Sequence, residues 1–525
     1  MLNRSLKDVM NSLSRLIFYG SPLLRRICTT TTAGDAVEAA AALGTTSTKS
    51  SSSNKRIYGR ISAIGFTGGK VSDVLHRHIR EGNVVRKEEL VNCIRNLRKY
   101  KRYQHCLEIL EWMDKSRMNY SARDYALRLD IVSKLQGIAA AEKYFDSLPP
   151  DAKNLYTYGT LLNCYCKENM VDKASALFEE IEKLNFSTHL VFNNLMTLFV
   201  KVGQPEKVPP LIQEMKERNL LVGSHAYNIL MQSYACMNDL AAVESTLEEI
   251  QKDDTKCDWT VYSNLATVYI KAGLLEKAKL ALNQLEEFLK NSAHRERLPY
   301  HFLISLYASV DNLAGVNRVW DTLKSHFPGC HNLSYLCLLQ ALSKLDDVGG
   351  LTEYFEEWNN CYRSYDMRLA NVVLAAYLRH DRVDEAELLC KGVDAKAPAP
   401  YFRGHGMFIS YFLDKGEICS ALKHMETATA KVSKDHKWKP DPERIAAFFK
   451  YFEEEKDVES AEEFCRMLKK VNGLDSNAFL SLLQIYVSAG KMEAGMRKRM
   501  GEYGIEISSE HKILLNKVCP KIDQQ

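Results

Sequence analysis

Long hydrophobic runs are missing from this 525-residue sequence, in which no uninterrupted apolar stretch approaches the roughly 20 residues of a membrane-spanning helix. We therefore expect no membrane insertion. The 13 prolines rarely interrupt the apolar periodic segments, and proline is the strongest helix breaker, so a mostly helical chain is favoured. The chain is also too long for one compact core, which predicts several domains or a repeat array.

Paired cysteines are missing as well. None of the 14 cysteines forms a C-x-x-C pair, and Cys164 and Cys166 are one residue too close for a zinc-ribbon knuckle. Reduced thiols packed as small apolar residues are favoured over metal ligands or disulfides. The pattern predicts a reducing compartment, no metal site and no cofactor.

Catalytic motifs are missing too. Residues 68–71 resemble a phosphate-binding loop but lack its hydroxyl residue, and His424-Met425-Glu426 resembles a zinc-deaminase motif without the P-C-x-x-C that should follow. Both are therefore interpreted as ordinary linker and surface-helix residues. The sequence predicts that the protein is not an enzyme.

Basic charge is concentrated at the N-terminus. Residues 1–60 hold nine basic and three acidic side chains, so the remaining 465 residues carry a net charge of −2. Residues 1–28 are amphipathic, rich in Arg and Ser and poor in acids, which predicts a mitochondrial transit peptide; a chloroplast leader and an ordinary disordered tail are the alternatives. Residues 29–60 predict a disordered Ser/Thr/Ala-rich linker, and residues 61–86 an N-terminal lead-in.

An internal repeat organises the rest of the chain. Counting from Tyr262 as an anchor, Tyr269 follows at +7, Lys271 at +9, Gly273 at +11 and Ala278 at +16. The same frame recurs at intervals of 33 to 40 residues. We number the repeats 1 to 12 by their anchors, which are Leu90, Tyr125, Tyr158, Phe192, Tyr227, Tyr262, Tyr300, Tyr335, Ala370, His405, Ile445 and Phe479.

Each repeat is predicted to form two amphipathic helices. The anchor, +3 and +7 positions share one helical face, a turn follows near +11, and a small residue at +16 lets the second helix approach closely. One hairpin cannot bury such a face alone, so neighbouring repeats must stack. The sequence predicts an all-α fold, a right-handed α-solenoid of about twelve helix-turn-helix repeats of ~35 residues over residues 87–520.

The repeats resemble a known family. The segment LYTYGTLLNCYCKENMVDKASALFEEIEKLN and the segment WTVYSNLATVYIKAGLLEKAKLALNQLEE are similar to pentatricopeptide repeats of the P class of plant organellar proteins. The resemblance implies an organellar protein that binds single-stranded RNA. Together with the Arg-rich leader, it predicts a protein of the mitochondrial matrix that acts on mitochondrial transcripts, in their processing, stability or translation. The alternative is a structural or protein-binding solenoid associated with the mitochondrial ribosome.

The +9 positions carry the charge expected of an RNA-binding surface. Seven of the twelve are basic, and equivalent positions of stacked repeats form one stripe, so they are candidate phosphate contacts. The alternative is a solvated cation that complements the dipole at a helix C-terminus. The candidates are Lys99, Lys134, Lys167, Lys201, Lys271, Lys344 and Arg379.

The resemblance also implies a base-reading pair in each repeat, formed by the residue after the anchor and the residue four before the next anchor. Only Asn228/Asp258 matches a familiar combination, which implies uracil, while Asn193 and Asn371 are further candidate base contacts. Most other pairs contain a residue that offers no donor or acceptor to a base. Further base-reading pairs in this frame are Asn193/Gly223, His301/His331, Leu336/Asp366, Asn371/Tyr401 and Gly406/Asp441.

Overall fold

The computed structural model describes residues 57–64, 69–252, 257–291, 296–329, 331–362, 364–397, 399–433 and 437–520. Regular structure within these ranges is helical, with no strand, so the all-α prediction is confirmed. None of the described helices has the length and apolarity to cross a membrane. The predicted transit peptide, residues 1–28, lies outside the described residues, as does the predicted linker up to residue 56.

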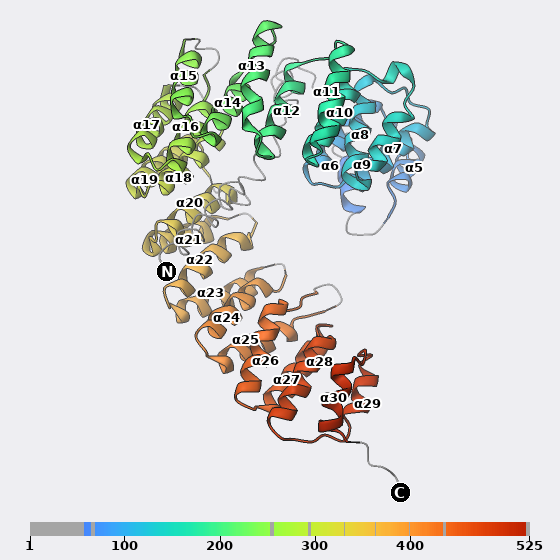
Figure 1. The fold of residues 1–525 in the computed structure, drawn as a ribbon, viewed down its shortest axis with the longest axis vertical. Coiled ribbons are helices and arrows are strands. Elements are labelled where there is room, and N and C mark those ends of the chain that lie inside the picture. The colour runs from blue at the N-terminus through green and yellow to red at the C-terminus, as the bar shows by residue number, and fades with distance from the viewer. Residues whose placement is uncertain are drawn as a thin grey trace. The chain divides into compact units, whose positions relative to one another are not determined.

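Each repeat opens with a first helix that contains the anchor (Figure 1). In repeat order these first helices are α6 (Lys87–Lys99), α8 (Ala122–Gln136), α10 (Leu155–Lys167), α12 (His189–Lys201), α14 (Ser224–Cys236), α16 (Trp259–Lys271), α18 (Leu298–Ser309), α20 (Asn332–Lys344), α22 (Met367–Arg379), α24 (Phe402–Asp414), α26 (Pro442–Glu454) and α28 (Ser476–Ser488).

A second helix closes each repeat. In the same order these second helices are α7 (Tyr103–Lys115), α9 (Ile138–Asp146), α11 (Val171–Lys183), α13 (Val208–Glu217), α15 (Leu240–Gln251), α17 (Leu275–Asn291), α19 (Leu313–His326), α21 (Val348–Cys361), α23 (Val383–Lys396), α25 (Ile418–Ala430), α27 (Val458–Lys470) and α29 (Met496–Glu502). Helix α5 (Val71–Arg80) precedes the first repeat and α30 (Ser509–Val518) follows the last.

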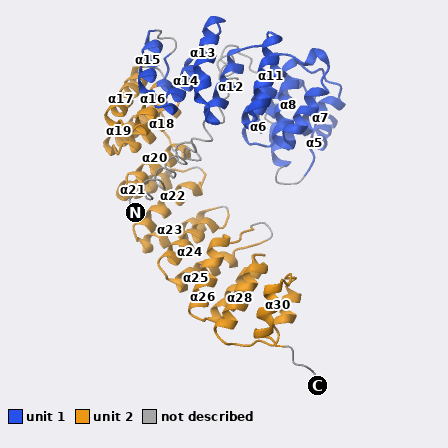
Figure 2. Cartoon of the chain, in the orientation of Figure 1, with its two compact units in different colours: residues 1–261 blue, residues 262–525 orange. Residues whose placement is uncertain are grey.

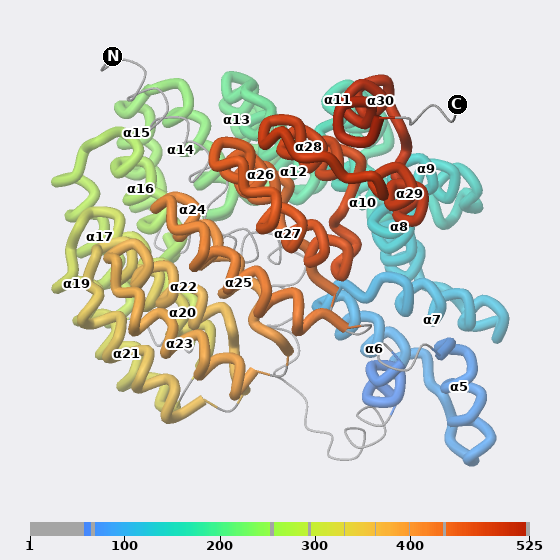
Figure 3. Tube along the Cα trace, turned by 90° about the horizontal axis from the view of Figure 1, so that it is seen from below, coloured from blue at the N-terminus to red at the C-terminus, as the bar shows by residue number. Residues whose placement is uncertain are grey.

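The chain divides into two compact units, residues 1–261 and residues 262–525 (Figure 2). Within the first unit, α10 packs against α8 and α12 as well as against its own partner α11. Within the second, α20 packs against α18, α21 and α22, of which Figure 3 labels α21 and α22 beside α20. Within each unit, hairpins therefore pack on their neighbours in the chain, as the predicted helical repeat solenoid requires.

The predicted turns at +11 are confirmed by the backbone. Asn169, Asn238 and Asp311 have φ values of 59°, 58° and 53°, and Gly203 and Gly273 have 79° and 73°. This left-handed conformation ends a helix, and Gly, Asn and Asp adopt it most readily. The choice of turn residue thus fixes where each first helix stops.

The +16 position lies in the core of repeats 1 to 11. From Cys106 in repeat 1 to Ala461 in repeat 11, the residue at +16 is completely buried in every repeat. Most of these residues are small, as Ala174 and Ala278 are, although repeat 8 buries Leu351 at the same position. The sequence interpretation of this position is confirmed.

Tyrosine hydroxyls connect the helices at two levels. An anchor hydroxyl reaches the second helix of its own repeat, as where Tyr158 donates to Glu180 at 2.7 Å. A +7 hydroxyl instead reaches the second helix of the preceding repeat, as where Tyr307 donates to Glu286 at 2.8 Å. Arg318 binds the same Glu286 carboxylate with two nitrogens at 2.9 Å. Anchors thus hold a repeat together, and +7 residues join consecutive repeats.

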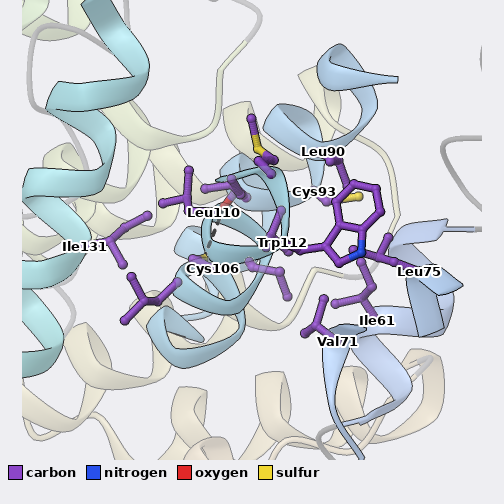
Figure 4. Packing of buried hydrophobic residues seen from close by; sticks show 14 of the residues in the cluster. Ile61, Val71, Leu75, Leu90, Cys93, Cys106, Leu110, Trp112 and Ile131 are labelled. Atoms are coloured by element: carbon purple, nitrogen blue, oxygen red, sulfur yellow. Dashed lines mark hydrogen bonds between the residues drawn. The ribbon is translucent and has the colours of Figure 1, made fainter. Parts of the chain in front are cut away.

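The first described residues depart from the expected boundary. Residues 57–64 are helical, so the last four residues of the predicted linker belong to a helix, not to a disordered segment. Ile57, Ile61 and Ile64 lie at helical spacing and are buried in one hydrophobic cluster with Leu90 and Trp112 (Figure 4). This apolar stripe gives the short helix a core to pack against, which the polar composition of the linker as a whole concealed.

Candidate nucleic-acid interface

The candidate phosphate contacts lie at the C-terminal ends of the first helices. Lys99, Lys167, Lys201, Lys271, Lys344 and Arg379 are each the last residue of their helix, and Lys134 lies two residues before the end of α8. All seven residues are exposed, although the Lys134 side chain is only 28% exposed. The +11 turn fixes the end of each first helix, so it also fixes the place of the cation two residues earlier.

One buried carboxylate gathers three cations in the first compact unit. Asp130, on the inner side of α8, accepts from Arg98 at 2.8 Å and from Lys134 at 2.7 Å, and Lys167 lies 4.0 Å away. These cations come from repeats 1, 2 and 3. Lys134 also lies over the Tyr103 ring, 5.3 Å from its centroid. The cluster retains an excess of two positive charges at one edge of the stack.

Burial and charge act against each other at Asp130. Burial alone would raise the pKa of this carboxyl, but the charges of Lys134 and Arg98 outweigh it and hold the pKa below its ordinary value. Asp130 is therefore ionised at neutral pH. The pKa of Lys167 is lowered, mainly by burial and also by the Lys134 charge, although Asp130 opposes the shift.

The seven +9 cations are called the column from here on. In three later repeats, the column cation contacts the end of the preceding first helix. Lys201 donates to the Lys167 carbonyl at 3.2 Å, and Lys344 donates to the Ser309 hydroxyl at 2.8 Å. Arg379 donates to the Ser343 carbonyl at 3.0 Å. A cation near these helix ends complements the dipole, as the structural alternative expected. The same side chains remain exposed and have further N–H groups, so the two roles are compatible.

The uracil-reading candidates are connected through a residue that the sequence did not single out. The Asn228 amide nitrogen donates to the Thr260 hydroxyl at 2.7 Å. One oxygen of Asp258 accepts from the Thr260 backbone N–H at 2.8 Å, and the other accepts from the Ser224 hydroxyl at 2.6 Å. Asn228 and Asp258 therefore belong to one hydrogen-bonded chain that holds both side chains in place.

The other two candidate asparagines differ in their surroundings. Asn193 is buried, and its partner position is Gly223, which has no side chain to orient it. Asn371 is half-buried, and its amide oxygen accepts from the Tyr401 hydroxyl at 2.8 Å. The structure thus brings the pair Asn371/Tyr401 together.

Three further base-reading pairs show which contacts these positions make in other repeats. His301 and His331 both contact the Ser334 hydroxyl, at 2.9 and 3.2 Å, and burial lowers the pKa of His301 to about 4. Leu336 is 1% exposed, so it serves the core. At Gly406, an added Cβ would lie 2.8 Å from the Arg444 guanidinium, so the space beside this glycine is filled by another side chain.

Sequence reasoning missed three residues that organise this surface, namely Asp130, Thr260 and Tyr401. Tyr401 appeared only as a pair partner, and nothing in the sequence showed that it is 1% exposed. Asp130 carried a weak signal, since it is an acid at +5 on the apolar side of a predicted helix. Thr260 carried none, because its role depends on the Asp258 and Asn228 side chains that flank it.

Comparisons with known proteins agree with the repeat frame. The family model described as the PPR repeat matches residues 153–182, 190–220 and 225–254. A mitochondrial pentatricopeptide repeat-containing protein of Arabidopsis thaliana is 41% identical over 470 residues, covering 89% of this chain and 87% of its own. A second, also named mitochondrial, is 40% identical over 515 residues, covering 98% and 100%. Their names confirm the predicted mitochondrial localisation.

Two more matches differ in kind. The large ribosomal subunit protein mL101 of Arabidopsis thaliana is 36% identical over 472 residues, covering 89% of this chain and 95% of its own. A solved structure of the pentatricopeptide repeat protein PPR10, in complex with an 18-nucleotide RNA element, covers 87% of this chain and 83% of its own. It is 14% identical, with a TM-score of 0.35.

Proposed function

Because this chain belongs to the pentatricopeptide-repeat family, we propose that it binds single-stranded RNA in mitochondria without acting as an enzyme. Its targets are mitochondrial transcripts, and the outcome is their processing, stabilisation or translation. The observation that carries the proposal is the column of seven exposed +9 cations near the ends of first helices, which occupies repeats 1 to 4, 6, 8 and 9. Two mitochondrial relatives of similar length, both named pentatricopeptide repeat-containing proteins, are consistent with it.

Phosphate binding follows from the position of the cations. Each column residue lies at the end of a first helix, and one repeat corresponds to one step along the column. A lysine ammonium has three N–H donors, so Lys201 and Lys344 each keep donors for a phosphate oxygen while they contact the preceding repeat. In the first compact unit, Asp130 holds Arg98 and Lys134 in fixed places before any ligand arrives.

Base reading is confined to few repeats under this proposal. At Asn228, the Thr260 and Asp258 contacts fix the amide plane, which is the condition for reading a pyrimidine edge. Leu336 and Gly406 offer no polar group. We therefore propose that affinity comes mainly from the phosphates and that sequence preference is limited to one or two positions.

The experiment replaces four column cations without placing a new charge beside Asp130. We expect the variant to lose most affinity for single-stranded RNA, and the slope of log K against log salt to become about 3 units less steep, from about 0.7 per lost phosphate contact. Fluorescence anisotropy at several salt concentrations measures both quantities. The substitutions are Lys99→Gln, Lys201→Gln, Lys271→Gln and Lys344→Gln.

The matched control removes the same charge from second helices. Four exposed lysines in or directly after α9, α11, α15 and α17 serve this purpose, and we expect little change in the salt slope. Equal losses in both variants would mean that bulk charge and not the column binds RNA. The control substitutions are Lys143→Gln, Lys183→Gln, Lys252→Gln and Lys290→Gln.

A second candidate function is a structural role in the mitochondrial ribosome. The observations that favour it are the similarity to mL101 along 95% of that protein and the small number of polar base-reading pairs. Sedimentation of tagged protein from mitochondrial extract separates the two proposals. Stoichiometric migration with the large subunit that resists high salt supports the ribosomal role. Crosslinking to defined transcripts in fractions free of ribosomes supports the first.

A further inference from the structure

A buried polar cluster lies where repeats 9 and 10 meet in the second compact unit. Cys390 and Asp394 lie one turn apart on α23, and His405 is the anchor of α24, a position held by an aromatic residue in most other repeats. One donor atom of each residue lies within 4.8 Å of the other two. Cys390 and His405 are buried, and Asp394 is half-buried.

His405 has the arrangement of a metal ligand whose second ring nitrogen makes a supporting hydrogen bond. Its Nδ1 lies 3.2 Å from Nδ1 of His424, and its Nε2 lies 3.1 Å from the Lys431 ammonium. An ammonium only donates, so His405 Nε2 is the acceptor and the ring proton is on Nδ1, donated to His424. Metal-binding histidines donate their other N–H in this way, which fixes both the tautomer and the ring plane.

The aspartate is oriented in the same manner. Its Oδ1 accepts from the Tyr401 backbone N–H at 3.2 Å. Its Oδ2 faces the cluster, 2.6 Å from the Lys431 ammonium and 3.5 Å from His405 Nε2. His424 is held as well, because its ring stacks on Phe408 at a centroid distance of 4.2 Å. The inward donor atoms of His405 and Asp394 thus each belong to a side chain that has a supporting contact on its outer side.

We propose that Cys390, Asp394 and His405 form a Zn²⁺ site, in which the Lys431 ammonium holds the position of the cation until zinc replaces it. Zinc takes sulfur, nitrogen and carboxylate oxygen ligands in tetrahedral sites. Lys431 is the C-terminal neighbour of α25, and its side chain is 30% exposed, so the flexible stem has a route outward. A water molecule or another ligand completes the fourth position.

The charges balance in both states. Without zinc, the Asp394 carboxylate is paired with the Lys431 ammonium, and the buried Cys390 thiol keeps its proton and carries no charge. With zinc, the Cys390 thiol releases its proton to solvent, and the thiolate and the Asp394 carboxylate neutralise Zn²⁺ as Lys431 moves into water. Neither state leaves a net charge buried among these residues.

Such a site would join two consecutive repeats. Two ligands come from the second helix of repeat 9 and one from the first helix of repeat 10, so zinc would fix one hairpin on the next in addition to the apolar contacts. Cysteine spacing in the sequence predicted no metal site. The ligands escape a motif search because they lie on two helices, with 3 and 10 residues between successive ligands.

Cobalt substitution of the full chain tests the proposal directly. The starting protein carries Cys236→Ser, Cys361→Ser and Cys419→Ser, because these three exposed thiols would bind cobalt non-specifically. We expect Co²⁺ to produce a thiolate-to-cobalt charge-transfer band at one equivalent, which Zn²⁺ then displaces. Cys390→Ser should abolish the band, and His405→Gln should weaken Zn²⁺ binding by more than about 100-fold, since loss of a supporting contact alone costs 10–100-fold.

Two further variants separate binding from folding. Lys431→Met removes the competing ammonium and should tighten Zn²⁺ binding, a gain that unfolding cannot imitate. His424→Phe keeps a ring against Phe408 but removes the acceptor of the His405 N–H, and should weaken binding by about 10–100-fold. The proposal is overturned if the starting protein gives no charge-transfer band, whatever Lys431→Met does, or if the band persists in Cys390→Ser.

Discussion

The two compact units use the end of the first helix in different ways. In the first unit, four successive repeats place a lysine at +9, from Lys99 to Lys201, and Asp130 fixes the neighbouring cations from inside. In the second unit, Lys344 and Arg379 are followed by Asp414 in repeat 10 and Glu454 in repeat 11. The helices that carry these residues are nevertheless alike, since α12, α24 and α26 each span 13 residues.

The different charges at +9 in the two units show that the residues needed for folding are not the residues at +9. The residues at +11 and +16 set the helix ends and the packing in both units, whatever charge stands at +9. A position that tolerates lysine, serine and aspartate at the same place in the fold is not required for the fold. The charge of the column is therefore available for function, and the two units are expected to contribute unequally to RNA binding.

The largest expected effect tests whether the stack behaves as a series of neighbours. Phe192 anchors repeat 4, is completely buried and packs edge-on against Phe178 of repeat 3 at 5.1 Å. Phe192→Ala should cost about 3–5 kcal/mol, the range for removing a buried aromatic ring. Limited proteolysis followed by mass spectrometry should show new cleavage in repeats 3 to 5, while the second compact unit stays protected. Equal loss of protection in both units would contradict a nearest-neighbour stack.

A smaller effect is expected from the buried carboxylate that distinguishes the first unit. Asp130→Asn leaves Arg98, Lys134 and Lys167 without their counter-charge. Removing one partner of a fully buried pair costs about 3–5 kcal/mol. The three cations are partly exposed, so solvent screening reduces the expected loss to roughly 1–3 kcal/mol. Urea unfolding of the two proteins at pH 7 measures it.

The pH dependence of that difference follows from the direction of the pKa shift. The pKa of Asp130 is lower in the folded protein than in the unfolded chain, so its stabilisation is complete above the unfolded value, about 3.9. The stabilisation is lost as the pH falls through the folded pKa. The gap between wild type and Asp130→Asn should therefore be constant from pH 7 to about pH 5 and should narrow below pH 4. A gap that widens in acid would contradict the assigned role.

The sequence was sufficient for the helices and turns that repeat and not for contacts that occur once. The turn residues Asn169 and Gly203 and the small residue Ala174 recur at fixed intervals, so periodicity alone located the helices. Asp130 and His405 have no counterpart in other repeats, and their partners lie up to 37 residues away in sequence. Such contacts depend on how one hairpin lies on the next, which no local pattern records.

The base-reading pair gives the next effect in size. Asn228→Ala should weaken binding by about 1–3 kcal/mol to an RNA that places uracil at this repeat, a range taken from base contacts in DNA. RNAs that differ only at that nucleotide should then bind alike. Anisotropy competition among the four nucleotides measures the change. Asn371→Ala belongs to repeat 9 and should leave discrimination at the repeat-5 nucleotide unchanged. A uniform loss with all four nucleotides would show that Asn228 supports the helix packing and reads no base.

The smallest effect is expected from giving the second unit the +9 lysines of the first unit. Asp414→Lys and Glu454→Lys place lysines at the exposed ends of α24 and α26, where the fold already tolerates different charges. Lys415 is paired with Asp381 at 2.7 Å and lies next to Asp414, so the new lysine at this site must turn away from it.

If the column binds phosphates throughout, each new lysine should steepen the salt slope for a long single-stranded RNA by about 0.7, and affinity should rise less than about tenfold. A short RNA that occupies only the first repeats should bind with the wild-type slope. Steeper slopes with both RNAs would indicate a general charge effect, and an unchanged slope with the long RNA would confine phosphate binding to the first compact unit.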